Sequence, residues 1–122
     1  AYTYFLGEAD PDDLPGSLRR AAQNRADYMR PWPAEPHSIA HGILDDETYD
    51  WLALVEAMAT TDGDVLVVSE ERLRQANRLG TEAGYAVSHT GSAGLAGLMD
   101  ALTGRVPDAA NAAVLFTGVE RR

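Results

Sequence analysis

Residues 87–98 read VSHTGSAGLAGL and contain the transition that decides the expected fold. An apolar stretch leads into hydroxyl-bearing residues and a glycine, and small apolar residues with the spacing of a closely packed helix follow. Hydroxyls and glycines between a strand and a helix are where backbone N–H groups face a ligand. The segment therefore predicts a strand, a ligand-binding loop over 88–92 and a helix over 92–103.

The pattern on either side of this segment predicts the fold class. Short apolar runs at 65–68, 85–87 and 112–116 are typical of strands buried on both faces. Helices are expected between them, the first over 70–82 with Ser69 as its N-cap. The order strand, helix, strand, helix, strand predicts an α/β fold, with a parallel sheet and flanking helices. Loop 88–92 would then lie at the carboxyl end of a strand, where such sheets bind ligands.

The whole chain, residues 1–122, is expected to form a single segment with three parts. Residues 1–36 are a lead-in region with a helix over 14–29. Residues 37–63 are a connection and a second helix, which the apolar stripe of Trp51, Leu54 and Val55 indicates. Residues 64–119 are the βαβαβ unit.

Composition excludes several classes of function. The formal net charge of −9 argues against nucleic acid as the main partner, because phosphate binding needs a basic patch. No apolar run approaches the roughly 20 residues of a membrane helix, and no secretory leader is visible. Cysteine is absent, which fits a cytoplasmic protein. All ten basic residues are arginine, so this chain has no lysine side chain for a Schiff base.

Two known motifs match the loop only in part. A nucleophile elbow needs glycine two residues before and two residues after its serine. If Ser92 were that serine, Thr90 would occupy the position of the first glycine. Gly91, Gly94 and Gly97 recur every third residue, unlike the G-x-G-x-x-G spacing of dinucleotide sites. We expect Gly94 and Gly97 to let the helix pack closely on the sheet.

Several segments in order carry a resemblance to a known family. They are DVLVVSEERLRQANRLGTEAGYAVSHTGSAGLAGLMDAL at 64–102 and NAAVLFTGVE at 111–120, with HSIAHGILDDETYDW at 37–51. Together they resemble the carboxyl-terminal part of the fold type II, or β-family, pyridoxal-phosphate enzymes, over roughly residues 37–119. Ser88 and His89 replace that family's usual Glu-Pro and are nearer the wording of threonine synthases. The resemblance therefore favours a threonine-synthase-like lyase over a threonine or serine dehydratase.

The resemblance implies roles for the loop residues. Pyridoxal 5'-phosphate acts as an electron sink for carbanions at the substrate's α-carbon. Thr90 occupies the Ser/Thr position of the family motif, so its hydroxyl is the expected partner of the pyridine nitrogen, with Ser92 as the fallback. Gly91 would let the backbone approach the ring, and His89 would face the ring. No residue of this chain is expected to be catalytic by itself.

The resemblance also implies partners. The Schiff-base lysine and the glycine-rich phosphate loop lie far upstream in typical members, so an amino-terminal half that carries them is missing here. The chain would then be part of a larger three-layer α/β/α domain in an enzyme that forms a homodimer when intact. Its amino-acid substrate would be a phosphorylated homoserine, converted to threonine and phosphate. Alone, the chain is expected to be inactive.

Other interpretations of the same residues stay open. His37 and His41 are four residues apart, but no third ligand is evident, so no metal site is expected. The Thr90 hydroxyl could instead cap the helix that begins near Ser92. The chain could also be a non-catalytic α/β module that binds a ligand or partner through loop 88–92.

Overall fold

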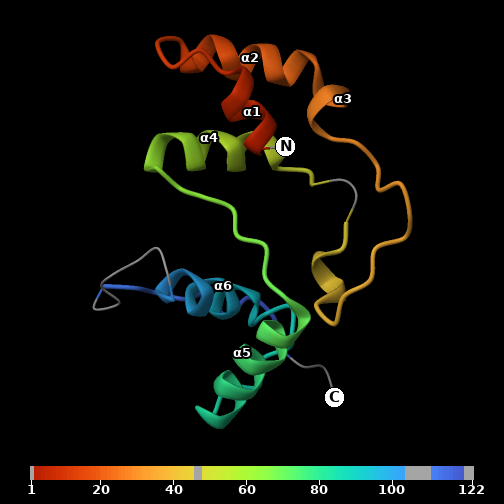
Figure 1. Cartoon of the computed structure of the whole chain (residues 1–122), viewed down its shortest axis with the longest axis vertical. Coiled ribbons are helices and arrows are strands. Elements are labelled where there is room, and N and C mark those ends of the chain that lie inside the picture. Colours follow the sequence, from red (N-terminus) through yellow and green to blue (C-terminus); the bar gives the residue numbers. More distant parts are fainter. Residues whose placement is uncertain (1, 46–47, 104–110, 120–122) are drawn as a thin grey trace. The chain divides into compact units, whose positions relative to one another are not determined.

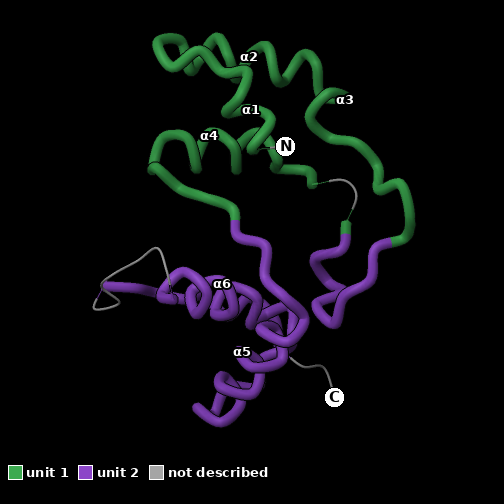
Figure 2. Tube along the Cα trace, viewed as in Figure 1, with its two compact units in different colours: residues 1–35, 45–65 green, residues 36–44, 66–122 purple. Residues whose placement is uncertain are grey.

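The structure is a computed structural model that describes residues 2–45, 48–103 and 111–119. Helices make up 53% of the described residues, and no β-sheet forms among them (Figure 1). The helices, with one 3-10 turn, are α1 (Tyr2–Glu8), α2 (Leu14–Gln23), α3 (Arg25–Tyr28), η1 (His41–Ile43), α4 (Trp51–Thr61), α5 (Glu70–Glu82) and α6 (Ala93–Leu102). The chain divides into two compact units, residues 1–35 with 45–65 and residues 36–44 with 66–122 (Figure 2).

The predicted parallel sheet is wrong. Among the described residues the only β pairing is an isolated antiparallel bridge between Val87 and Val119. The runs at 65–68 and 112–116 have no regular secondary structure, and they are largely exposed: Val67 is 96% exposed and Leu115 81%. A parallel strand needs a neighbouring strand for its backbone hydrogen bonds, and a short apolar run does not specify that neighbour. The predicted βαβαβ unit over 64–119 and the predicted three-layer α/β/α domain both need this sheet, so they are wrong as well.

The first unit is a small helical cluster. Its core contains Tyr2, Phe5, Ala21, Trp51 and Val55, contributed by α1, α2 and α4. Asp13 caps α2 by accepting a hydrogen bond from the Gly16 N–H at 2.9 Å, and the expected helix over 14–29 is interrupted at Asn24. Leu54 was expected to face inward but is 51% exposed, because the buried face of α4 is set by Trp51 and Val55.

The second unit consists of α5 packed on α6, with the segment 36–44 laid against them. Its core is made of small side chains around Leu73, namely Ala40, Ala76 and Ala96. The prediction of a helix over 70–82 is confirmed, and Ser69 caps it by accepting from the Arg72 N–H at 3.1 Å. Arg72 in turn reaches Asp100 on α6 at 2.6 Å, which ties the two helices together.

Candidate functional site

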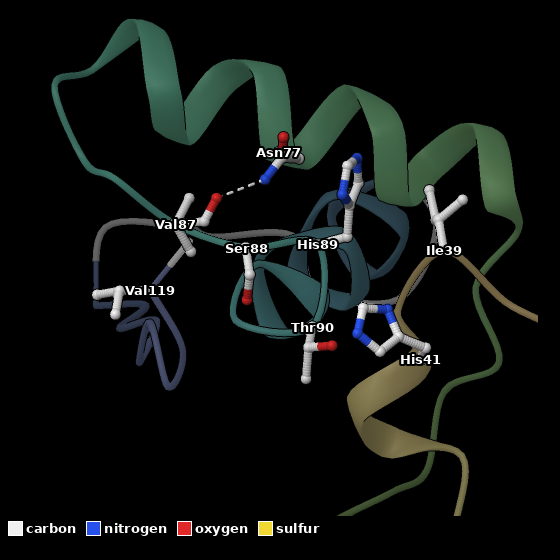
Figure 3. Close-up of a pocket in the computed structure, with 8 residues that line it drawn as sticks. All are labelled: Ile39, His41, Asn77, Val87, Ser88, His89, Thr90 and Val119. Carbon is white, nitrogen blue, oxygen red and sulfur yellow. Dashed lines mark hydrogen bonds between the residues drawn. The ribbon is translucent and has the colours of Figure 1, made fainter. Parts of the chain in front are cut away.

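The second unit contains a cavity of about 460 Å³ beside the predicted loop. It is lined by Ile39, His41, Asn77, Val87, Ser88, His89, Thr90 and Val119 (Figure 3). These residues come from the segment 36–44, from α5, from the loop before α6 and from the end of the described chain. None of them is acidic, in a chain whose net charge is −9.

Loop 88–92 is shaped by its own serine side chains. The Ser88 Oγ accepts from the Gly91 N–H at 3.0 Å, and the Ser92 Oγ lies 3.1 Å from the carbonyl oxygens of both Ser88 and His89. Ser92 is fully buried, so its hydroxyl is occupied within the turn. Such local side-chain to backbone bonds are typical of turns that start helices. The loop is therefore fixed before any ligand is considered.

The end of the described chain closes over this loop. The Ser88 N–H donates to the Gly118 carbonyl oxygen at 3.1 Å, next to the bridge between Val87 and Val119. A Cβ atom on Gly91 would overlap the Gly118 backbone. Glycine is thus required at position 91 because the backbone of Gly118 approaches closely. From the sequence, a cofactor ring was expected to be what approaches this glycine.

Segment 36–44 is held by polar contacts with α5 and with loop 88–92. Glu70, in the first turn of α5, accepts from the Ser38 hydroxyl at 2.6 Å and from the Ile39 N–H at 3.0 Å. The hydrogen bond from Ser38, followed by that from Ile39, lowers the pKa of the Glu70 carboxyl. The second contact joins the Gly42 N–H to the Thr90 Oγ1 at 3.1 Å. Together they hold His41 at the cavity.

The Thr90 hydroxyl can still act as a hydrogen-bond donor. Its Oγ1 accepts from Gly42 and, in the described residues, makes no hydrogen bond with the first turn of α6, so the capping interpretation finds no support. A threonine hydroxyl is one donor and two acceptors. Gly42 uses one acceptor position, and the O–H donates to no other described residue; Oγ1 itself lies on the side of His41 (Figure 3).

The two cavity histidines come from different parts of the chain. His89 follows Ser88 in the loop, and its ring extends toward α5, whereas the His41 ring lies near Thr90 (Figure 3). His37, its expected companion, does not line the cavity. Within the described ranges no group of three or more His, Cys, Asp or Glu residues is arranged to hold a metal ion.

The structure separates the four expected cofactor residues into two pairs. Thr90 and His89 line the cavity, whereas Gly91 and Ser92 are buried behind it. Sequence reasoning missed Asn77, whose side-chain N–H donates to the Val87 carbonyl at 2.7 Å and fixes the strand-like stretch before the loop. It also missed Ile39 and the role of Glu70. The helical position of Asn77, four residues after Leu73 on the inward face of α5, was the available signal.

Comparison with family models, curated proteins and solved structures finds no match to this chain. None of the helices in the described part of the chain has both the length and the apolar character needed to cross a membrane.

Proposed function

We propose that this chain supplies the pyridine-ring side of the pyridoxal-phosphate site in a threonine-synthase-like lyase. The observation that carries the proposal is the Thr90 hydroxyl, which lines the cavity and donates no hydrogen bond to another described residue. A buried hydroxyl, by contrast, would have had no access to a ring.

The cavity lining suits an aromatic ring with an unprotonated nitrogen. A hydroxyl donates a neutral hydrogen bond to such a nitrogen, whereas a carboxylic acid would transfer its proton. None of the described residues that line the cavity is acidic, so none of them competes with Thr90 for that nitrogen. The apolar contacts of Ile39 and Val87 and the imidazole of His89 offer surfaces for a ring face. The cofactor, when bound, supplies the electron sink for a carbanion at the substrate's α-carbon.

The chain's own residues position the cofactor ring, and they do not themselves carry out the chemical reaction. Thr90 orients the ring through its nitrogen, and Gly42 orients Thr90. Glu70 holds the segment that carries Gly42 and His41. The amine that takes the α-proton has to come from a second polypeptide stretch, since no lysine is present here. The substrate in this proposal is a phosphorylated homoserine, and the intact enzyme is a cytoplasmic homodimer.

The binding experiment uses pyridoxine 5'-phosphate, which has the ring and phosphate of the cofactor but no aldehyde. Because a net hydrogen bond is worth about 1 kcal/mol, Thr90→Val should weaken its binding roughly fivefold. Thr90→Ser keeps the hydroxyl and should stay within about twofold. Affinities come from chemical shifts of the His89 and Thr90 amides. Equal affinities for the valine and serine variants would remove the proposed role of Thr90.

The activity experiment adds a polypeptide with the lysine and glycine-rich phosphate loop of a fold type II enzyme, together with pyridoxal phosphate. Release of phosphate from the phosphorylated homoserine is expected only when both polypeptides are present. Release by the added polypeptide alone, at the same rate, would show that this chain contributes nothing to the reaction. Formation of a keto acid and ammonia from serine or threonine would instead indicate a dehydratase.

A further inference from the structure

The first unit has a cavity of its own, of about 690 Å³, between α1 and the end of α4. This volume lies in the range of small-molecule sites, roughly 300–1,000 Å³. Its residues all belong to residues 1–35 and 45–65, so it is distinct from the Thr90 site. The function proposed for that site makes no use of it.

The inner surface of this cavity is apolar. It is formed by Phe5, Leu14, Met58 and Ala59, with Tyr2 beside them. The Tyr2 hydroxyl is already used, because it donates to the Gly63 carbonyl at 3.0 Å. Phe5 is only 1% exposed, so a ligand would contact chiefly the half-buried side chains of Leu14, Met58 and Ala59. Such a surface takes an alkyl or aryl group.

The rim of the cavity carries negative charge from several sources. Asp10, Asp62 and Asp64 line it, and none of the described lining residues is basic. Asp62 is also the C-cap of α4, where the helix dipole adds partial negative charge, and the last turn of α4 contains no basic residue. A concave site with charge of one sign at its mouth concentrates ions of the opposite sign.

We infer that this cavity binds a small organic cation in which an ammonium group is joined to an apolar group. The apolar part lies on Leu14, Met58 and Ala59, and the ammonium lies at the rim near Asp10 and Asp62. Charge complementarity selects the cation, and a volume of about 690 Å³ suits a small molecule. A simple metal cation would not use the apolar surface, and a neutral hydrocarbon would gain nothing from the negative charge of the rim.

The test compares three probes that share a phenyl group on four methylenes and differ only in their head group: 4-phenylbutylammonium, 4-phenylbutanol and 5-phenylpentanoate. Methyl chemical shifts of Leu14, Met58 and Ala59 report binding in the whole chain, and those of Leu95 and Met99 in the second unit serve as references. The ammonium should bind at least about fivefold more tightly than the alcohol, as expected for about 1 kcal/mol of exposed charge pairing. The carboxylate should bind most weakly.

Matched variants locate the charge effect. Asp62→Asn suits the left-handed conformation at this position, where φ is 55°, because asparagine tolerates it as well as aspartate does. It and Asp10→Asn should each weaken the ammonium two- to fivefold and leave the alcohol unchanged. Glu56→Gln removes an exposed charge of α4 that does not line the cavity and should change neither affinity.

Three results would overturn the inference. Equal affinity for the three probes would mean that the cavity does not select a cation. An equal loss in Glu56→Gln would mean that the chain's overall charge, and not the rim, attracts the probe. Shifts at Leu95 and Met99 as large as those at Met58 would mean that the probes bind without a site.

Discussion

Gly91 shows how one position in this chain is restricted by a contact distant in sequence. Its Cα faces the backbone of Gly118, and a side chain there would overlap the Gly118 carbonyl oxygen. The neighbour is backbone, which cannot rotate away as a side chain can. Gly97 in α6 is different, since a Cβ atom would lie 3.8 Å from Leu66 Cδ1, an ordinary contact.

Replacing Gly91 with alanine should therefore destabilise the second unit. We expect the free energy of unfolding to fall by about 1–3 kcal/mol, the usual cost of overpacking. Gly97→Ala, the matched control, should be neutral or should raise it by up to about 1 kcal/mol, because glycine is a poor helix former. Urea unfolding followed by circular dichroism measures both. A Gly91 variant as stable as the Gly97 variant would contradict the close contact with Gly118.

At the scale of elements, the segment 36–44 depends on its attachment to α5. It contains only the short turn η1, so helical hydrogen bonds do little to fix its position. The contacts of Ser38 and Ile39 with Glu70 anchor it, and the contact of Gly42 with Thr90 completes its attachment. The arrangement of His41 in the cavity therefore depends on the charge of one carboxylate.

Acidification should release this segment. A carboxyl whose pKa is lowered in the folded protein contributes stability that is fully present above its unfolded pKa, about 4.3 for glutamate. Since the pKa of Glu70 is lowered, chiefly by the Ser38 hydroxyl, its contribution is lost as the pH falls below that value and through the lowered pKa. The protection factor of the Ile39 amide, which compares its exchange with that of an unprotected amide at the same pH, should fall over that range.

The Glu70→Gln variant should show a low protection factor of the Ile39 amide at neutral pH and little further change in that factor on acidification. Glu71→Gln is the matched control, because the Glu71 carboxylate accepts from Gln75 in the same helix. Its Ile39 amide should behave as in the unaltered chain. Identical pH profiles in all three proteins would contradict the role given to Glu70.

At the scale of the whole molecule, the sequence predicted α5 well, did not predict α1, and predicted the assembly of the elements poorly. The bounds of α5 and its Ser69 cap were predictable because both depend on neighbouring residues. The absence of the sheet was not predictable from these patterns. The runs at 65–68 and 112–116 have the apolar character of strands, but the sequence does not specify which segment each would pair with. The same difference applies to the site. Thr90 and His89 were named through the motif that the loop shares with the family it resembles, whereas His41, Ile39 and Asn77 reach the cavity through contacts distant in sequence.

The two cores share no residue, so they should respond separately to mutation. Leu73 is 3% exposed, and Leu73→Ala should cost the second unit about 2–5 kcal/mol. Phe5→Ala should cost the first unit about 3–5 kcal/mol. Amide exchange resolves them: Leu73→Ala should accelerate exchange in α5 and α6, and Phe5→Ala in α1, α2 and α4. Acceleration throughout the chain in both variants would mean that the units unfold as one.

The solvent-exposed apolar stretches around Val67 and Leu115 affect how the protein aggregates in solution. Extended, uncharged runs of this kind are templates on which chains stack into insoluble fibrils. What keeps the molecules apart is mutual repulsion from a formal charge of −9, which vanishes near the isoelectric point of about 4.6. Colloidal stability is thus set by the acidic residues, and dilute, weakly alkaline buffers of low ionic strength are the conditions that preserve it.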